Sequence, residues 1–191
     1  EITTRLVGSE MCIRDSVYPN QVETEGITNI TLEDVSYIEN AGGVIKLLGQ
    51  IKYINDNEIA AFVSPAVVYN GSQLASVKDV FNAILVRGDA VGDVCFYGPG
   101  AGKLPTASAV VADIIDCAKH SERKKIFGWG AGNEDYVVDY KERIEMPFYV
   151  RAKATPAEIN AKFSDVKFLS RKGQPSDEVA FITDTVSYTH L

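Results

Sequence analysis

The sequence YGPGAGKLPTASAVVADIID, residues 97–116, decides how this chain is interpreted. Three glycines at alternate positions precede an apolar stretch with Pro105 near its start. This pattern predicts a helix from about Pro105 to His120. A glycine turn before a helix presents unpaired backbone N–H groups at the positive end of the helix dipole, an arrangement that binds phosphates and other anions. The stretch is therefore a candidate cofactor contact.

Neither standard nucleotide motif fits the spacing of this turn. A G-x-G-x-x-G fingerprint would need a glycine at position 103, where the chain has Lys103. A Walker A loop would need a glycine at position 97 and Ser or Thr after the lysine, whereas the chain has Tyr97 and Leu104. From the local pattern alone, a strand-to-helix turn that needs small residues only for packing is an equally good interpretation.

The composition sets limits on the class of protein. The chain has 191 residues, 46% of them hydrophobic, which is enough to bury a core. A formal net charge of -7 argues against a nucleic-acid partner, because phosphate binding needs a basic face. No apolar run reaches the roughly twenty residues that span a bilayer, so we expect no membrane partner. The chain has three cysteines, Cys12, Cys95 and Cys117. Because they lack the spacing of a disulfide framework or a metal site, we expect a cytoplasmic protein.

Both ends of the chain resemble peptides that are translated from sequencing-adaptor DNA at the ends of metagenomic reading frames. These are residues 1–16, EITTRLVGSEMCIRDS, and the terminal VSYTHL, residues 186–191. We interpret both as translation artefacts and exclude them from fold reasoning. The native segment is then expected to run from about Val17 to Thr185.

Alternating helix and strand signals follow residue 17. Thr31 and Asp34 precede an apolar-periodic run that ends at a glycine pair, which predicts a helix over about 31–41. Four stretches rich in β-branched and aromatic residues predict strands, of which the first two form an antiparallel pair: 44–53, 59–69, 81–87 and 94–97. We therefore expect an α+β fold with a mixed, mostly antiparallel sheet backed by helices.

A charged segment, 121–145, has weak periodicity and is predicted to be a linker. The remainder predicts a strand, a helix and two further strands: 146–153, 156–163, 166–170 and 179–183. This βαββ order opens a ferredoxin-like unit, βαββαβ, whose last helix and strand are missing. The chain is therefore expected to stop inside a domain.

Long stretches of the chain carry a family resemblance. VETEGITNITLEDVSYIENAGGVIKLLGQIKY, and then FVSPAVVYNGSQLASVKDVFNAILVRGDAVGDVCFYGPGAGKLPTASAVVADIID, resemble the second half of homoserine dehydrogenase over residues 22 to about 120. The order EGI, VIKLLG, LASV, FNA, GDAVG, YGPGAG and PTASAVV is kept at the spacing of that family. The tail from Met146 resembles the start of the ACT domain that bacterial members carry.

The resemblance implies an NAD(P)-dependent enzyme that interconverts L-aspartate 4-semialdehyde and L-homoserine in threonine, methionine and isoleucine biosynthesis. That family combines a Rossmann domain, a catalytic and dimerisation region, and often an ACT domain. The cofactor, NADP or NAD, carries the hydride, while a lysine handles the proton and carboxylates position the substrate. The resemblance also implies a homodimer or higher homo-oligomer, and an amino-acid effector.

Carried over residue by residue, the resemblance assigns only a cofactor contact. Gly102 matches a family position near the nicotinamide end of the dinucleotide, and Gly100 and Ala101 form the turn before it. The family's catalytic lysine and carboxylates belong to a D-x-x-G-x-D-A-A-x-K segment that should precede VETEGI, where this chain has residues 1–16. We therefore assign no catalytic residue and no metal ligand, and expect the fragment alone to be inactive.

The expected organisation is an artefact, a catalytic and dimerisation region, a linker, a partial ACT domain and a second artefact: 1–16, 17–120, 121–145, 146–185 and 186–191. The alternative function is a non-catalytic, amino-acid-binding regulatory module. Other charged residues of the chain are expected to have solvent, turn or helix-end roles rather than catalytic ones: Glu25, Asp89, Asp93, Lys103 and His120.

Overall fold

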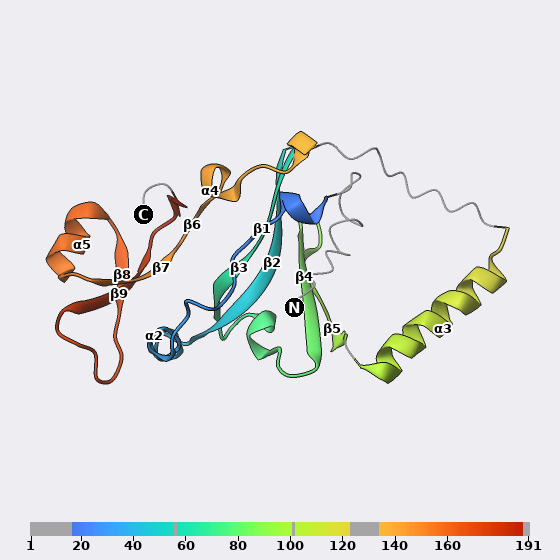
Figure 1. Ribbon diagram of the computed structural model, residues 1–191, viewed down its shortest axis with the longest axis horizontal. Helices are drawn as coiled ribbons and strands as arrows, with labels where there is room; N and C mark the ends of the chain where they lie inside the picture. The colour runs from blue at the N-terminus through green and yellow to red at the C-terminus, as the bar shows by residue number, and fades with distance from the viewer. Residues whose placement is uncertain (1–16, 56, 101, 123–133, 189–191) are drawn as a thin grey trace. The chain divides into compact units, whose positions relative to one another are not determined.

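The computed structural model describes residues 17–55, 57–100, 102–122 and 134–188. By their internal contacts these residues fall into two compact units (Figure 1). The first unit combines 17–68 with 134–188, and the second contains 69–122. The described strands form small, mostly antiparallel sheets, so the protein is of the α+β class that the sequence predicted.

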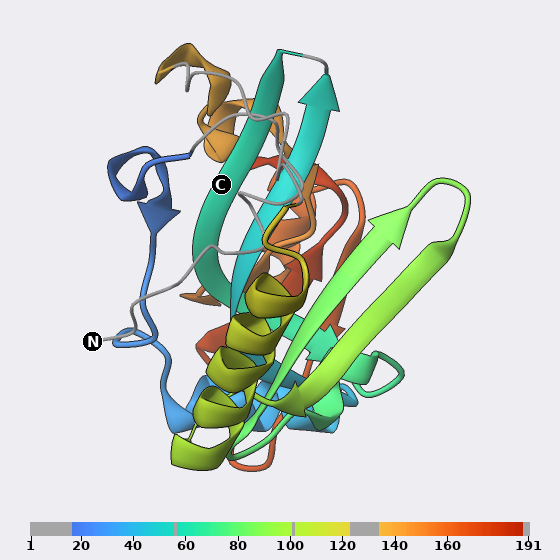
Figure 2. The same cartoon turned by 90° about the vertical axis from the view of Figure 1, so that its right-hand side faces the viewer.

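The first unit begins with a three-stranded mixed sheet of order β1-β3-β2. A 3-10 turn, η1 (Pro19–Gln21), leads to β1 (Glu23–Thr24), which pairs in parallel with β3 (Glu58–Tyr69). Helix α2 (Leu32–Asn40) precedes β2 (Gly43–Asn55), the hydrogen-bonded neighbour of β3. Figure 2 shows β2 and β3 running in opposite directions, as the sequence predicted for this pair.

The two faces of β3 contribute to separate clusters of buried side chains. One cluster consists of Val17, Val22, Ile59, Ala61 and Val63. The other contains Ala60 and Phe62 together with Tyr140 and Ile144. This split follows from the period of two along a strand, which sends successive side chains to opposite faces.

The end of the predicted linker is packed rather than loose. It forms η3 (Glu134–Tyr136) and a short helix, α4 (Tyr140–Arg143). The Tyr140 ring stacks on Phe62 with 4.1 Å between centroids. Two ion pairs, Lys141–Glu23 and Arg143–Glu58, also join α4 to the first sheet. The weak periodicity of this segment did not indicate its core contribution, which comes mainly from Tyr140 and Ile144. Residues 123–133 lie outside the described part.

A second three-stranded sheet lies at the C-terminal end of the first unit. Strand β7 (Tyr149–Lys153), helix α5 (Pro156–Lys162), β8 (Val166–Leu169) and β9 (Glu178–Thr183) follow in the predicted βαββ order. Both outer strands pair antiparallel with β9, and the sheet order is β7-β9-β8. Its core is formed by Ile159, Val179 and Phe181. That this sheet belongs to an ACT domain stays a prediction.

Short strands and helix α2 complete the first unit. β10 (Val186–Ser187) pairs antiparallel with β6 (Glu145–Met146), so two residues of the terminal segment interpreted as an artefact lie in a β-ladder. On its buried side, α2 packs against the C-terminal sheet through a shared cluster: Tyr37, Ile38, Leu169 and Ala180. Residues far apart in the sequence therefore form one core around α2.

The second unit contains η2 (Gln73–Ser76), a β-hairpin and a long helix. The hairpin pairs β4 (Phe81–Gly88) with β5 (Gly92–Pro99). Helix α3 (Lys103–Lys119) begins two residues before the predicted start at Pro105. None of its residues is buried, and its large apolar side chains lie on the surface: Leu104, Val110, Val111, Ile114 and Ile115. Among the described helices, none is long and apolar enough to cross a membrane.

Candidate functional site

The glycine turn connects β5 to α3. Gly102 is the N-cap residue of α3, with φ 115° and ψ 157°. This left-handed region favours glycine because it has no Cβ. Gly100 and Gly102 are both exposed, and Ala101 lies outside the described residues. The backbone of the turn is thus accessible at the N-terminus of a 17-residue helix.

Gly100 is also restricted by space. A Cβ atom built at this position would lie 2.5 Å from Asn82 Nδ2, on the neighbouring strand β4. Any larger residue would have to displace the Asn82 side chain. Because Asn82 is exposed and its side chain can turn away, the stronger requirement for glycine is the positive φ at Gly102.

The chemistry of this turn suits a contact through the backbone. The first N–H groups of a helix lack intrahelical acceptors, and together with the helix dipole they attract an anion. Lys103 begins α3 with an exposed side chain. These features suit an anionic group. Among the described residues, there is no group of three or more His, Cys, Asp or Glu side chains that could hold a metal ion.

Other charged residues of the second unit have local partners, at the loop end of the hairpin and at the end of α3. Arg87 binds Asp93 with two hydrogen bonds, of 2.6 and 2.9 Å. Asp89 accepts a hydrogen bond from the backbone N–H of Ala90 at 2.7 Å. His120 Nδ1 lies 2.9 Å from Asp116 Oδ1 near the end of α3. These contacts agree with the turn and helix-end roles expected for Asp89, Asp93 and His120.

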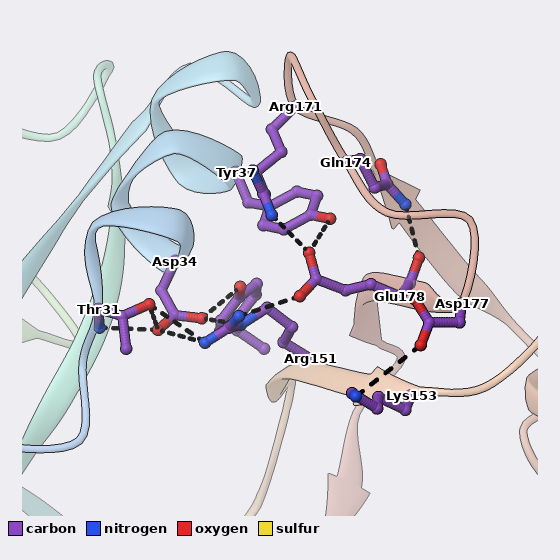
Figure 3. Close-up of polar contacts among 10 residues, drawn as sticks. Thr31, Asp34, Tyr37, Arg151, Lys153, Arg171, Gln174, Asp177 and Glu178 are labelled. Carbon is purple, nitrogen blue, oxygen red and sulfur yellow. Dashed lines mark hydrogen bonds and ion pairs between the residues drawn. The ribbon is translucent and has the colours of Figure 1, made fainter.

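A second polar site lies in the first unit, between α2 and the C-terminal sheet (Figure 3). We call it the α2 cluster, and it contains Asp34, Tyr37, Tyr149, Arg151, Arg171 and Glu178. Arg151 Nε donates to Asp34 Oδ1 at 2.7 Å, and its Nη1 donates to Glu178 Oε2 at 3.1 Å. Arg171 Nη2 donates to Glu178 Oε1 at 2.9 Å. Two carboxylates and two guanidinium groups therefore neutralise one another.

Two tyrosine hydroxyls complete the α2 cluster. Tyr149 donates to Asp34 Oδ1, and Tyr37 donates to Glu178 Oε1, each at 2.9 Å. Burial, and then the hydrogen bond to Asp34, raise the pKa of Tyr149 well above its ordinary value. This hydroxyl consequently keeps its proton and acts as a donor.

The carboxylates of the α2 cluster are held in their charged form. Burial opposes ionisation of Asp34, but hydrogen bonds from Thr31, Tyr149 and Arg151 bring its pKa below the ordinary value. Burial likewise opposes ionisation of Glu178, while bonds from Tyr37, Arg171 and Arg151 lower its pKa. With both acids ionised and paired, the cluster holds structure together rather than moving protons.

The sequence indicated the glycine turn but missed the α2 cluster. Asp34 was recognised only as a helix-capping residue. One signal was available: Tyr149, Arg151 and Lys153 alternate along a strand, which places them on one face. That pattern could have indicated a polar face, although it could not have named α2 as the partner.

The chain is similar in sequence to members of one protein family. The sequence profile described as Homoserine dehydrogenase matches residues 5–115. A homoserine dehydrogenase from Neisseria gonorrhoeae is 46% identical over 95 residues, which are 50% of this chain and 22% of that protein. One from Lactococcus lactis is 38% identical over 114 residues, 60% of this chain and 26% of that protein. The chain spans about a quarter of the length of these relatives.

The start of the profile match concerns the interpretation of residues 1–16 as an artefact. The match begins at residue 5, inside the segment that we interpret as an artefact, so that interpretation stays a prediction. Residues 1–16 lie outside the described part of the structure.

Solved structures match over a longer part of the chain. A homoserine dehydrogenase from Thiobacillus denitrificans has a TM-score of 0.74 and 29% identity, covering 96% of this chain and 45% of that one. A Staphylococcus aureus homoserine dehydrogenase at pH 6.0 gives a TM-score of 0.73 and 27% identity, covering 95% and 46%. The similarity in structure therefore extends beyond the residues that the family profile matches.

Proposed function

The chain belongs to the homoserine dehydrogenase family, and on this premise we propose that it is part of an enzyme that interconverts L-aspartate 4-semialdehyde and L-homoserine with NADP or NAD. The observation that carries this proposal is the family match over residues 5–115. Similarity to two solved homoserine dehydrogenases over nearly the whole chain supports it.

The proposed contribution of this chain to the site is the turn at 100–102. A bound nicotinamide supplies or accepts the hydride of the reaction. Gly102 would then border the nicotinamide end of the dinucleotide with its backbone, and Gly100 would keep the turn clear of Asn82. The exposed position of both glycines and the positive φ of Gly102 support this assignment. No described residue is assigned the catalytic proton transfer, and we expect no turnover from this chain without the catalytic lysine segment of the family.

The second unit exposes apolar residues, which supports the proposal of a homodimer or higher homo-oligomer. Ile84 of β4, Phe96 of β5 and Ile114 of α3 are 57%, 62% and 62% exposed. Large apolar side chains at this exposure are typical of surfaces that another chain covers. Sedimentation of the purified chain should therefore show self-association, and a monomer at all concentrations would contradict this part of the proposal. The cytoplasmic location proposed for the protein depends instead on its cysteines, which lack the spacing of a disulfide framework.

An amino-acid effector is the second candidate function, and the βαββ order of the C-terminal sheet favours it. An effector that binds the native sheet but not the unfolded chain would raise the unfolding temperature, and the shift would grow with the logarithm of its concentration above the dissociation constant. L-threonine is the first compound to test. A shift with L-threonine but none with D-threonine would support a regulatory module.

A chimera tests the proposed activity. Residues 22–115 of this chain would replace the matching segment of the Neisseria gonorrhoeae enzyme, which is 46% identical over 95 residues. We expect homoserine-dependent reduction of NADP or NAD by the chimera. A chimera with the circular dichroism spectrum and oligomeric state of its parent, but without this activity, would overturn the proposed function. The parent enzyme serves as the positive control.

A further inference from the structure

The N-terminal cap of α2 is contacted by a residue from the far end of the chain. The backbone N–H and the hydroxyl of Thr31 donate to Asp34 Oδ2, at 2.8 and 2.9 Å. Arg151 of β7 then donates to both partners: its Nε to Asp34 Oδ1 at 2.7 Å, and its Nη2 to the Thr31 hydroxyl at 3.1 Å. Figure 3 shows this side chain directed at the start of α2.

Glu178 fixes the other side of the Arg151 side chain and is itself held by two further donors. Glu178 of β9 accepts from Arg151 on the side away from Asp34, and also accepts from Arg171 and Tyr37. The titratable and charged groups that face the cluster come from α2, from β7, from the loop after β8 and from β9: Glu33, Asp34, Tyr37, Tyr149, Arg151, Arg171 and Glu178. Helix α2 is thus held at its first turn and at its middle.

Burial makes this network sensitive to the loss of any one member. Asp34 is 5% exposed and Tyr37 is fully buried. Removing one partner of a buried ion pair leaves the other charge uncompensated, which costs far more than an exposed pair gains. Loss of Arg151, whose side chain is 26% exposed, would therefore leave the buried Asp34 carboxylate without its cationic partner.

The junction between α2 and β2 is tightly packed. A Cβ atom at Gly43 would lie 3.2 Å from Ile38 Cγ2 and 3.2 Å from the Val68 carbonyl oxygen. Little free space remains between the helix and the strand that follows it. A displacement of α2 would consequently be passed on to β2 rather than absorbed at the junction.

We propose that Arg151 makes the stability of the first turn of α2 depend on the contact between α2 and the C-terminal sheet. The α2 cluster then couples this sheet to the α2–β2 segment, and we call this coupling the latch. Any event that moves β7 relative to α2 would loosen the helix start. Arg151 is a positioning residue in this device and takes no part in the chemistry.

The chain contains a matched reference for this device. Helix α5 has the same type of cap, in which the Thr155 backbone N–H and hydroxyl donate to Glu158 at 2.7 and 2.8 Å. On β7 itself, Lys153 forms a surface pair with Asp177 at 3.8 Å, with side chains 87% and 67% exposed. Lys153→Gln therefore removes a cation from the same strand without touching the latch.

Hydrogen exchange measured by mass spectrometry on the full chain tests the latch. In Arg151→Gln, amides of α2 and of the C-terminal sheet should exchange at least about tenfold faster, because hydrogen bonds to charged groups are lost. Amides of the β4–β5 hairpin should keep their exchange rates. The ratio between the exchange rates of the α5 cap and of the C-terminal sheet should also stay the same. Lys153→Gln should exchange like the unmodified chain.

Two results would overturn the proposal. One is faster exchange in the C-terminal sheet while α2 stays as protected as before, and the other is equal acceleration of every segment including the hairpin. If Arg151→Gln does not fold, Arg151→Lys decides, because it keeps the charge but loses the planar fork of donors. That variant should show a smaller acceleration confined to α2 and the C-terminal sheet, and the same two results would count against the latch.

Discussion

Arg151 Nε lies 2.7 Å from Asp34 Oδ1, although 117 positions separate the two residues in the sequence. This bond joins the first turn of α2 to strand β7. Because Asp34 is also the N3 residue of the capping box whose N-cap is Thr31, one side chain stabilises both its own helix and the contact with a distant strand. The predictions that follow depend on this double role and on the glycine turn.

Asp34→Asn should destabilise the chain by about 2 kcal/mol or more, because it weakens the helix cap and leaves Arg151 without its charged partner. Glu158→Gln removes the equivalent carboxylate from the surface cap of α5 and should cost distinctly less. Urea unfolding of both variants beside the parent chain gives the comparison. Equal losses of stability in the two variants would show that Arg151 adds nothing to the cap.

The stability of the chain should fall on acidification below the ordinary carboxyl range. The pKa values of Asp34 and Glu178 are lowered in the folded chain from 3.8 and 4.5. Their stabilisation is therefore fully present above these unfolded values and is lost as the pH falls through the lower, folded values. Urea midpoints between pH 7 and pH 3 would show this slope.

The same titration has an internal control. Asp34→Asn should have a flatter acid slope than the parent chain, since one of the two carboxylates no longer takes up a proton on unfolding. Parallel slopes for parent and variant would mean that other carboxyl groups cause the acid sensitivity.

Phe62→Ala should destabilise the first unit by about 3–5 kcal/mol, the usual cost of removing a large buried ring. Phe62 is fully buried and stacks on Tyr140. Phe96→Ala is the matched control, because Phe96 is 62% exposed in the hairpin. Thermal unfolding should separate the two variants clearly. A Phe62→Ala chain as stable as Phe96→Ala would contradict the packing of α4 against β3.

Local signals in the sequence predicted the elements well. Thr31 and Asp34 marked the start of α2, and the structure begins that helix at Leu32 with Thr31 as its N-cap. Pro156 and the βαββ order of the tail were also interpreted correctly. Each of these features depends on residues within a few positions of one another, where capping and strand propensities act.

Contacts between distant segments could not be predicted in the same way. The pairing of Arg151 with Asp34 needs a particular docking of β7 on α2, and the alternation along 149–153 is compatible with many partners. Tyr140 lay in a charged segment without periodicity, yet its ring fills a place beside Phe62. The glycine turn was located from sequence, but the positive φ of Gly102 required coordinates.

The cofactor assignment is tested most directly by Gly102→Ala in the chimera with the Neisseria gonorrhoeae enzyme. Gly92→Ala is the control, because Gly92 lies in the same unit, has open space around its Cβ position and also has a positive φ, of 73°. Both substitutions strain the backbone. The Michaelis constant for NADP should rise about tenfold or more in Gly102→Ala, with the constant for homoserine changed much less. A Michaelis constant for NADP equal to that of Gly92→Ala, in a folded and active chimera, would contradict a cofactor contact at this turn.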